Sequence, residues 1–236
     1  MGMPRPGAIL VLHGFTASPQ TVAAVVPPLQ ARGFDVGVPT LRGHGARPET
    51  LRDVRWSDWV DDALAAFDKL AGNGHDIAVA GHSMGALVGA EVAVRRPVVA
   101  LALIAPALRF TNPLAPAAPL LAGILPRFPS PRSVYDEEAW RTAPNYKWFP
   151  VRAFAELFRL AARMKETLPR IRCPAVVFQS RRDQVVPSSA ARDVHDLLGS
   201  TEKELRWFEQ IGHDLFLDRG KEAVAEAVAE WFAARR

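Results

Sequence analysis

The sequence predicts an α/β protein with one mostly parallel sheet of about six strands and helices on both faces. Short apolar runs alternate along the chain with longer runs of helical spacing, which is the pattern of successive strand–helix–strand units. The apolar runs are continuous, as expected for strands that are buried on both faces of a sheet. One long segment, residues 107–165, interrupts the alternation and is too long for a plain connection.

The first half of the chain begins with an apolar strand over residues 8–12, which ends at a His-Gly pair. A helix is expected over residues 19–32, because Pro19 suits a first helical position and Gly33 suits the position after a last turn. A second strand is expected over residues 34–38.

The later elements follow the same two patterns. A helix is expected over residues 57–70, where apolar residues recur at helical spacing. The remaining strands are expected over residues 77–80, 98–104, 175–179 and 205–208. The other helices are expected over residues 84–95, 151–164, 188–198 and 221–234.

The interrupting segment differs from the rest in composition. It carries six prolines before Val134, then several aromatic residues, and then the helical run over residues 151–164. We therefore expect a core made of residues 1–106 and 166–236, with residues 107–165 inserted as a cap over the edge of the sheet.

Composition excludes several classes of protein. Of the 236 residues, 49% are hydrophobic and 23% are charged, which is ordinary for a globular protein and excludes a wholly disordered chain. The net charge of +4 comes without basic–aromatic interleaving or a binding motif, so we expect no nucleic acid partner. The longest charge-free stretch, residues 110–126, contains four prolines, so no integral membrane segment is expected.

A single cysteine, Cys173, cannot form an internal disulfide, and no secretory signal is visible. We therefore expect a cytoplasmic protein that is a monomer or a weak homodimer.

Residues 81–85 form the pattern G-x-S-x-G around Ser83, directly after an expected strand and before an expected helix. That context is the one a nucleophile elbow requires, in which a strained turn exposes the serine hydroxyl. Gly81 and Gly85 suit the turn, because a side chain at either position would collide within it.

A serine needs a base to act as a nucleophile. In proteins with a nucleophile elbow, the serine comes first along the chain, the acid second and the histidine third. Asp183 follows the expected strand 175–179, and His213 follows the expected strand 205–208. The carboxyl ends of parallel strands form the usual site of such sheets. We therefore expect His213 to take the proton of Ser83 and Asp183 to orient the imidazole.

Other acids and histidines compete for these roles. Asp214, Asp218 and Asp193 are alternatives to Asp183, although adjacent side chains diverge and Asp214 directly follows the histidine. His13 is expected to stabilise a turn, and His82 to pack beneath the serine. No pair of histidines has the spacing of metal ligands, so no metal site is expected.

An oxyanion hole requires two backbone N–H groups, one of which belongs to the residue after the nucleophile. That residue is Met84. The second group is expected in the loop after the first strand, where Gly14 allows a close turn and Phe15 supplies the N–H.

These motifs together resemble the α/β-hydrolase superfamily over essentially the full length, and more narrowly the bacterial carboxylesterases and monoacylglycerol lipases. The resemblance implies a three-layer α/β-hydrolase fold, a Ser–Asp–His triad, an acyl-enzyme intermediate, a cap domain and no cofactor. The segments that carry it are residues 12–16, 41–45, 58–60, 81–85, 172–175, 183–187 and 212–213.

The expected activity is that of a serine esterase acting on monoacylglycerols or other small apolar carboxylic esters. In the cap, Glu137 and Trp140 are expected to contact the substrate, and either Glu137 or Glu138 is expected to bind a glycerol hydroxyl. A C–C hydrolase or haloperoxidase-like activity with the same triad is an alternative. A non-catalytic ligand binder on the same fold is a second one.

Overall fold

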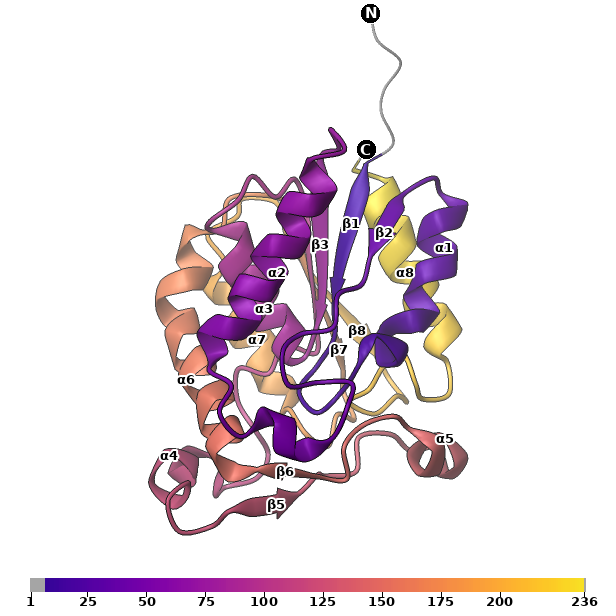
Figure 1. Ribbon diagram of the computed structural model, residues 1–236. Coiled ribbons are helices and arrows are strands. Elements are labelled where there is room, and N and C mark those ends of the chain that lie inside the picture. Colours follow the sequence, from indigo (N-terminus) through magenta and orange to yellow (C-terminus); the bar gives the residue numbers. More distant parts are fainter. Residues whose placement is uncertain (1–6, 236) are drawn as a thin grey trace, which may run out of the picture.

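The computed structural model describes residues 7–235, and its centre is a six-stranded sheet in which every neighbouring pair is parallel (Figure 1). The strand order is β2-β1-β3-β4-β7-β8. The strands are β1 (Ala8–Leu12), β2 (Asp35–Gly37), β3 (Ile77–His82), β4 (Leu101–Ile104), β7 (Ala175–Ser180) and β8 (Lys203–Phe208). The predicted parallel sheet of about six strands is confirmed.

Helices cover both faces of the sheet and create a three-layer structure (Figure 1). One face carries α2 (Trp56–Ala71), α3 (Met84–Ala93) and α7 (Ser188–Leu197), and the other carries α1 (Val26–Ala31) and α8 (Lys221–Ala233). Side chains of a strand point alternately to opposite faces. Leu10 of β1 therefore packs in the core beneath α2 and α3, whereas Ile9 packs in the core beneath α8.

The first predicted helix is wrong in form. Residues 19–32 fold as a 3₁₀ helix, η1 (Pro19–Val25), followed by the short α1, instead of one continuous α-helix. Pro27 and Pro28 cause the break, since they lack the N–H groups that would bond to the preceding turn and their rings crowd its carbonyls. The other predicted elements agree with the structure within a few residues at each end.

Between β4 and β7 the chain forms a layer across the carboxyl ends of the strands (Figure 1). Its short strands β5 and β6 pair antiparallel, with Phe128 opposite Phe149. Its elements are η3 (Ala115–Ala117), α4 (Ala118–Leu121), β5 (Arg127–Pro129), α5 (Glu137–Thr142) and β6 (Trp148–Pro150). The last helix of the segment, α6 (Val151–Thr167), instead runs along the side of the core and packs against α3 (Figure 1). The 3₁₀ helices η2 (Pro48–Leu51) and η4 (Leu168–Arg170) complete the fold.

We keep residues 107–165 as the proposed cap, with the remainder as the proposed core. Residues 1–6 and 236 of that core lie outside the described residues. Within residues 7–235, no helix combines the length and the apolar composition needed to cross a membrane.

A fully buried carboxylate fastens the last cap helix to the core. Glu91 of α3 is 0% exposed and forms ion pairs with Arg95 at 2.6 Å and with Arg163 of α6 at 3.1 Å. Thr167 of α6 also donates a hydrogen bond to it. Because an unpaired buried charge is costly, these partners hold α6 against the helix that follows Ser83.

A second buried carboxylate fastens the cap to the loop after β8. Asp218 accepts hydrogen bonds from four backbone N–H groups: Gly212 at 2.7 Å and Tyr135, Asp136 and Arg219 at 2.9 Å. Tyr135 and Asp136 belong to the cap, whereas Gly212 and Arg219 flank the loop that carries His213. One side chain therefore joins the two segments.

The connection from β3 to α3 is a sharp turn at Ser83, whose φ of 56° and ψ of −114° are strained for a residue with a side chain. A Cβ at Gly81 would lie 2.2 Å from the carbonyl oxygen of Gly85. A Cβ at Gly85 would lie 2.3 Å from the carbonyl oxygen of Leu12 in β1. The crossing of these backbones requires glycine at both positions.

We expect Gly81→Ala to prevent folding or to cost more than about 4 kcal/mol of stability, because the new Cβ meets backbone that cannot move aside. Thermal unfolding followed by circular dichroism checks this. Gly123→Ala is the matched control, since nothing lies within 4 Å of a Cβ there. Similar melting temperatures for the two variants would contradict the packing described here.

We expect Asp218→Ala to lower the free energy of unfolding by about 3 kcal/mol or more, since four backbone N–H groups lose a charged acceptor. Urea unfolding measures the loss. Asp196→Ala removes an aspartate side chain that is 77% exposed, and should change stability by less than about 0.5 kcal/mol. A loss of the same size in both variants would refute the fastening role.

Candidate active site

Three buried side chains meet at the carboxyl ends of the strands. Ser83 lies in the turn after β3, Asp183 in the loop after β7 and His213 in the loop after β8. His213 Nε2 lies 2.9 Å from Ser83 Oγ, and His213 Nδ1 lies 2.8 Å from Asp183 Oδ2. The structure thus brings together, in one hydrogen-bonded chain, the three residues expected to form the triad.

Asp183 is held as a carboxylate. Its Oδ1 accepts hydrogen bonds from the backbone N–H groups of Val185 and Val186, both at 2.8 Å. Burial opposes ionisation, but the charge and hydrogen bond of His213 and the two backbone amides outweigh it and hold the pKa of Asp183 below its usual range. Asp183 therefore offers a fixed negative charge to the imidazole.

His213 binds a proton more readily than an ordinary histidine, because its pKa is raised. Burial lowers its pKa, but the charge and hydrogen bond of Asp183, with the charge of Asp214, outweigh burial and raise the pKa above its ordinary value. Because Nδ1–H donates to Asp183, Nε2 is left to accept the hydroxyl proton of Ser83. This is the arrangement of a general base beside a nucleophile.

Gln179 is a positioning residue that sequence reasoning missed. It lies near the end of β7, is fully buried, and donates a hydrogen bond from Nε2 to Asp183 Oδ2 at 2.8 Å. This hydrogen bond from β7 fixes the orientation of the Asp183 carboxylate. A polar side chain within the otherwise apolar run 175–179 was the signal that could have revealed it.

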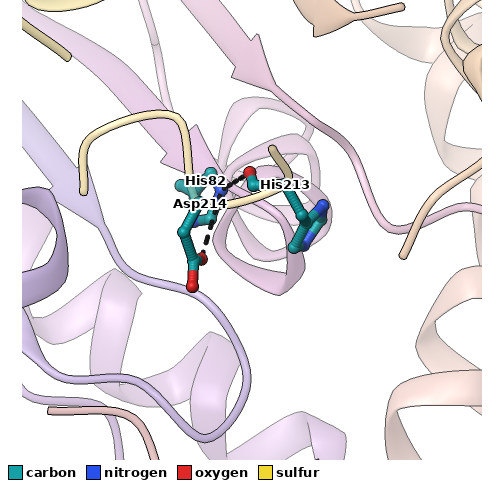
Figure 2. Close-up of side chains that lie close together, drawn as sticks. All are labelled: His82, His213 and Asp214. Carbon is teal, nitrogen blue, oxygen red and sulfur yellow. Dashed lines mark hydrogen bonds and ion pairs between the residues drawn. The ribbon is translucent and has the colours of Figure 1, made fainter. Parts of the chain in front are cut away.

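His82 lies behind the loop that carries His213 and outside the hydrogen-bonded chain. Figure 2 shows its Nε2 directed at the backbone carbonyl of His213, to which it donates a hydrogen bond of 2.9 Å. The same nitrogen lies 3.8 Å from Asp214 Oδ1. Burial lowers the pKa of His82, so it acts as a neutral donor that fixes the loop of His213.

His82, His213 and Asp214 are also the described residues that gather as possible metal ligands, with one donor atom from each within 4.8 Å of the others (Figure 2). Hydrogen bonds already occupy both nitrogens of His213 and Nε2 of His82. Asp214 Oδ2 accepts hydrogen bonds from Ser133 and Asn145. The cluster therefore fits a metal poorly, and the expectation of a metal-free site stays a prediction.

The loop after β1 lies against the nucleophile. A Cβ at Gly14 would lie 3.2 Å from Ser83 Cβ, so the backbone at Gly14 lies against the serine. Phe15 is the next residue along the chain. Met84 opens α3, where the helix dipole is positive. No described group accepts a hydrogen bond from the backbone N–H of Phe15 or Met84. Both are candidate donors to an oxyanion.

His13 shapes this loop. Its Nδ1–H donates to the carbonyl of Gly14 at 2.9 Å, and its Nε2 accepts from the N–H of Leu41 at 3.1 Å. Burial is the main cause that lowers the pKa of His13 to about 4, so the ring is neutral near pH 7. Its contacts are those of a residue that stabilises a turn.

A cavity of about 320 Å³ extends from Ser83 and His213 beneath the cap, and most of its lining is apolar. Trp140 lines it. Glu137 does not: its side chain is 77% exposed and forms an ion pair with Arg132 at 2.9 Å. The structure gives no support to the expected contact of Glu137 with a glycerol hydroxyl, because the carboxylate points to solvent from the first turn of α5.

Comparisons with known proteins identify the family of this chain. The family model described as serine aminopeptidase, S33, matches residues 4–220. A thermostable monoacylglycerol lipase of Bacillus sp. (strain H-257) is 29% identical over 97% of this chain and 91% of its own length. The carboxylesterase of Bacillus subtilis (strain 168) is 25% identical over 95% of this chain and 91% of its own.

A solved structure from work on LipS and LipT, two metagenome-derived lipolytic enzymes, superposes with a TM-score of 0.89 and 31% identity over 99% of this chain and 97% of that one. The fold that the motifs indicated is confirmed. The chain has the three-layer α/β-hydrolase fold and belongs to the serine aminopeptidase, S33, family.

Proposed function

We propose that Ser83, His213 and Asp183 are the catalytic triad of this carboxylic ester hydrolase, and that its preferred substrates are monoacylglycerols or other small apolar esters. The observation that carries the proposal is the hydrogen-bonded chain from Asp183 Oδ2 through His213 to Ser83 Oγ. Ser83 and His213 line a mostly apolar cavity. The names of the relatives, monoacylglycerol lipase and carboxylesterase, support the same reaction.

In the proposed mechanism, His213 Nε2 takes the proton of Ser83 Oγ as the oxygen attacks the ester carbonyl. The oxyanion accepts hydrogen bonds from the N–H groups of Phe15 and Met84. The imidazolium, stabilised by Asp183, then protonates the departing alcohol, and an acyl-serine remains. Water, activated by His213, attacks this ester, releases the acid and restores Ser83.

The cavity supports an acyl chain as the apolar part of the substrate. Its volume of about 320 Å³ lies at the lower end of small-ligand sites, which favours one chain over the several chains of a triacylglycerol. Phe110, Leu121 and Phe154 are among the cap residues that line it. Trp140 is proposed as a further substrate contact.

The alternatives differ in the bond attacked. A C–C hydrolase or a haloperoxidase-like enzyme would use the same three side chains, and a ligand binder would use the cavity alone. None of them accounts for the esterase and lipase names of the relatives. The monomeric or weakly dimeric state and the cytoplasmic location expected from the sequence stay predictions.

We expect hydrolysis of p-nitrophenyl esters, measured from C2 to C16, to be fastest at medium acyl lengths and to fall at least about 10⁴-fold in Ser83→Ala, which removes the nucleophile. Gly123→Ala, far from steric contacts, serves as the control with unchanged rates. Activity that survives in Ser83→Ala would exclude the proposed nucleophile.

We expect kcat/KM to rise with pH through a midpoint above 6.5, because His213 must be neutral to act as a base and its pKa is raised. Asp183→Asn removes the main cause of the raised pKa of His213. The midpoint of the variant should therefore move to lower pH, and its kcat should fall about 10⁴-fold. Rates measured from pH 5 to 9 test both effects. An unmoved midpoint in Asp183→Asn would show that Asp183 does not set the pKa of the base.

A further inference from the structure

The turn that carries Phe15, one of the two proposed oxyanion donors, is held in part by the cap. The next residue, Thr16, has a φ of 62°, which a β-branched side chain rarely adopts. Such a conformation persists only where the surroundings fix it. The carbonyl of Thr16 accepts a hydrogen bond of 2.8 Å from the backbone N–H of Tyr146, a residue of the proposed cap. A cap residue therefore helps to fix the turn beside the proposed nucleophile.

The other end of Tyr146 is anchored to a second loop of the core. Its hydroxyl donates a hydrogen bond to the carbonyl of Gly43 and accepts one from the N–H of Ala46, both at 3.0 Å. The residue is buried, and β6, which begins shortly after it, packs against η2. Tyr146 thus joins the loops of residues 13–16 and 43–46 and holds them at a fixed separation.

Ring contacts join Tyr146 to Phe15 by a second route. The rings of Tyr146 and His44 are nearly parallel, with 6.5 Å between their centroids. The ring of His44 in turn lies edge-on to that of Phe15, at 6.1 Å. Burial lowers the pKa of His44 to about 3, so this ring is neutral near pH 7. Phe15 also contacts two rings of the cap, those of Phe149 at 5.4 Å and Phe154 at 6.1 Å.

We infer that Tyr146 is a positioning residue that fixes the direction of the Phe15 N–H toward the oxyanion, so that the oxyanion hole forms fully only while the cap rests on the core. The inference rests on the proposed ester hydrolysis. A hydrogen bond weakens steeply when its donor turns away from the acceptor, so a small shift of the turn costs rate. Tyr146 does not line the cavity, so its effect passes through the turn.

Other roles of Tyr146 would give different kinetic results. A contact with the substrate would change KM. A contribution to stability alone would reduce the amount of folded enzyme and leave the rate per active site unchanged. An effect on His213 would move the pH midpoint of kcat/KM. Positioning of the oxyanion donor instead lowers kcat/KM per active site and weakens inhibitors that form an oxyanion.

Tyr146→Phe and Tyr146→Ala are the test variants. Tyr146→Phe keeps the ring and the backbone N–H and removes the hydrogen bonds to Gly43 and Ala46. With p-nitrophenyl octanoate we expect kcat/KM to fall about tenfold in Tyr146→Phe and about 100-fold in Tyr146→Ala, which approaches the loss of one oxyanion donor. Rates are expressed per active site, counted with a fluorophosphonate that labels Ser83. Tyr146→Phe decides alone if Tyr146→Ala does not fold.

Inhibition by heptyl trifluoromethyl ketone measures the stability of the oxyanion. Ser83 Oγ adds to the carbonyl carbon of this inhibitor, the hydroxyl proton passes to His213, and the carbonyl oxygen becomes an oxyanion, with no leaving group. The inhibition constant should rise by the factor by which kcat/KM falls, because the adduct resembles the transition state. The pH midpoint should not move, since the hydrogen bonds of His213 to Ser83 and Asp183 do not involve Tyr146.

Tyr135→Phe is the matched control. Tyr135 is the other tyrosine of the chain, and its hydroxyl also donates to a backbone carbonyl, that of Arg182 at 2.8 Å, away from the oxyanion turn. Its kinetic and inhibition constants should not change. An unchanged inhibition constant in Tyr146→Phe, or a moved pH midpoint, overturns the inference while ester hydrolysis stands. If the unmodified enzyme hydrolyses no ester, the proposed function fails and the inference fails with it.

Discussion

The close crossing of the β3–α3 turn over the end of β1 is the constraint on which the site depends. At this crossing the backbones approach so closely that Gly85 has no room for a side chain beside the carbonyl of Leu12. The approach turns Ser83 out of the sheet with a strained φ and directs the first N–H groups of α3 toward the same space. It also brings Gly14 against Ser83, so that one packing contact assembles the proposed nucleophile and the proposed oxyanion donors.

Buried hydrogen bonds hold the other two members of the proposed triad, Asp183 and His213, in position beside the serine. Gln179 and two backbone amides fix Asp183, while His82 fixes the carbonyl of His213. The side-chain donors, Gln179 and His82, are neutral, because a buried charge without a partner would destabilise the fold. Asp183 therefore has a defined partner in His213, which is the group left to change its protonation.

Sequence reasoning was most successful where local pattern and backbone geometry coincide. The elbow around Ser83 was visible because a strand, a serine between two glycines and a helix follow one another without a gap. Asp183 and His213 were located because each follows a strand of a parallel sheet, and such strands end at one edge. Their catalytic roles stay proposals.

Features that depend on tertiary contacts could not be predicted in this way. The break at Pro27 and Pro28 was missed because the helix was predicted from the signals at its two ends, Pro19 and Gly33. The solvent-facing position of Glu137 depends on how the cap folds. Asn145 and Asp218 act through partners far away in sequence. No local pattern marks such pairings.

The position of the cap within the chain also affects how proteins with this fold can diverge during evolution. The cap joins β4 to β7, which are direct neighbours in the sheet. The entropy of closing such a loop rises only slowly with its length, so insertions or deletions there cost the sheet little. Substrate range can therefore diverge by changes in this one connection, while the strands that precede Ser83, Asp183 and His213 keep their register.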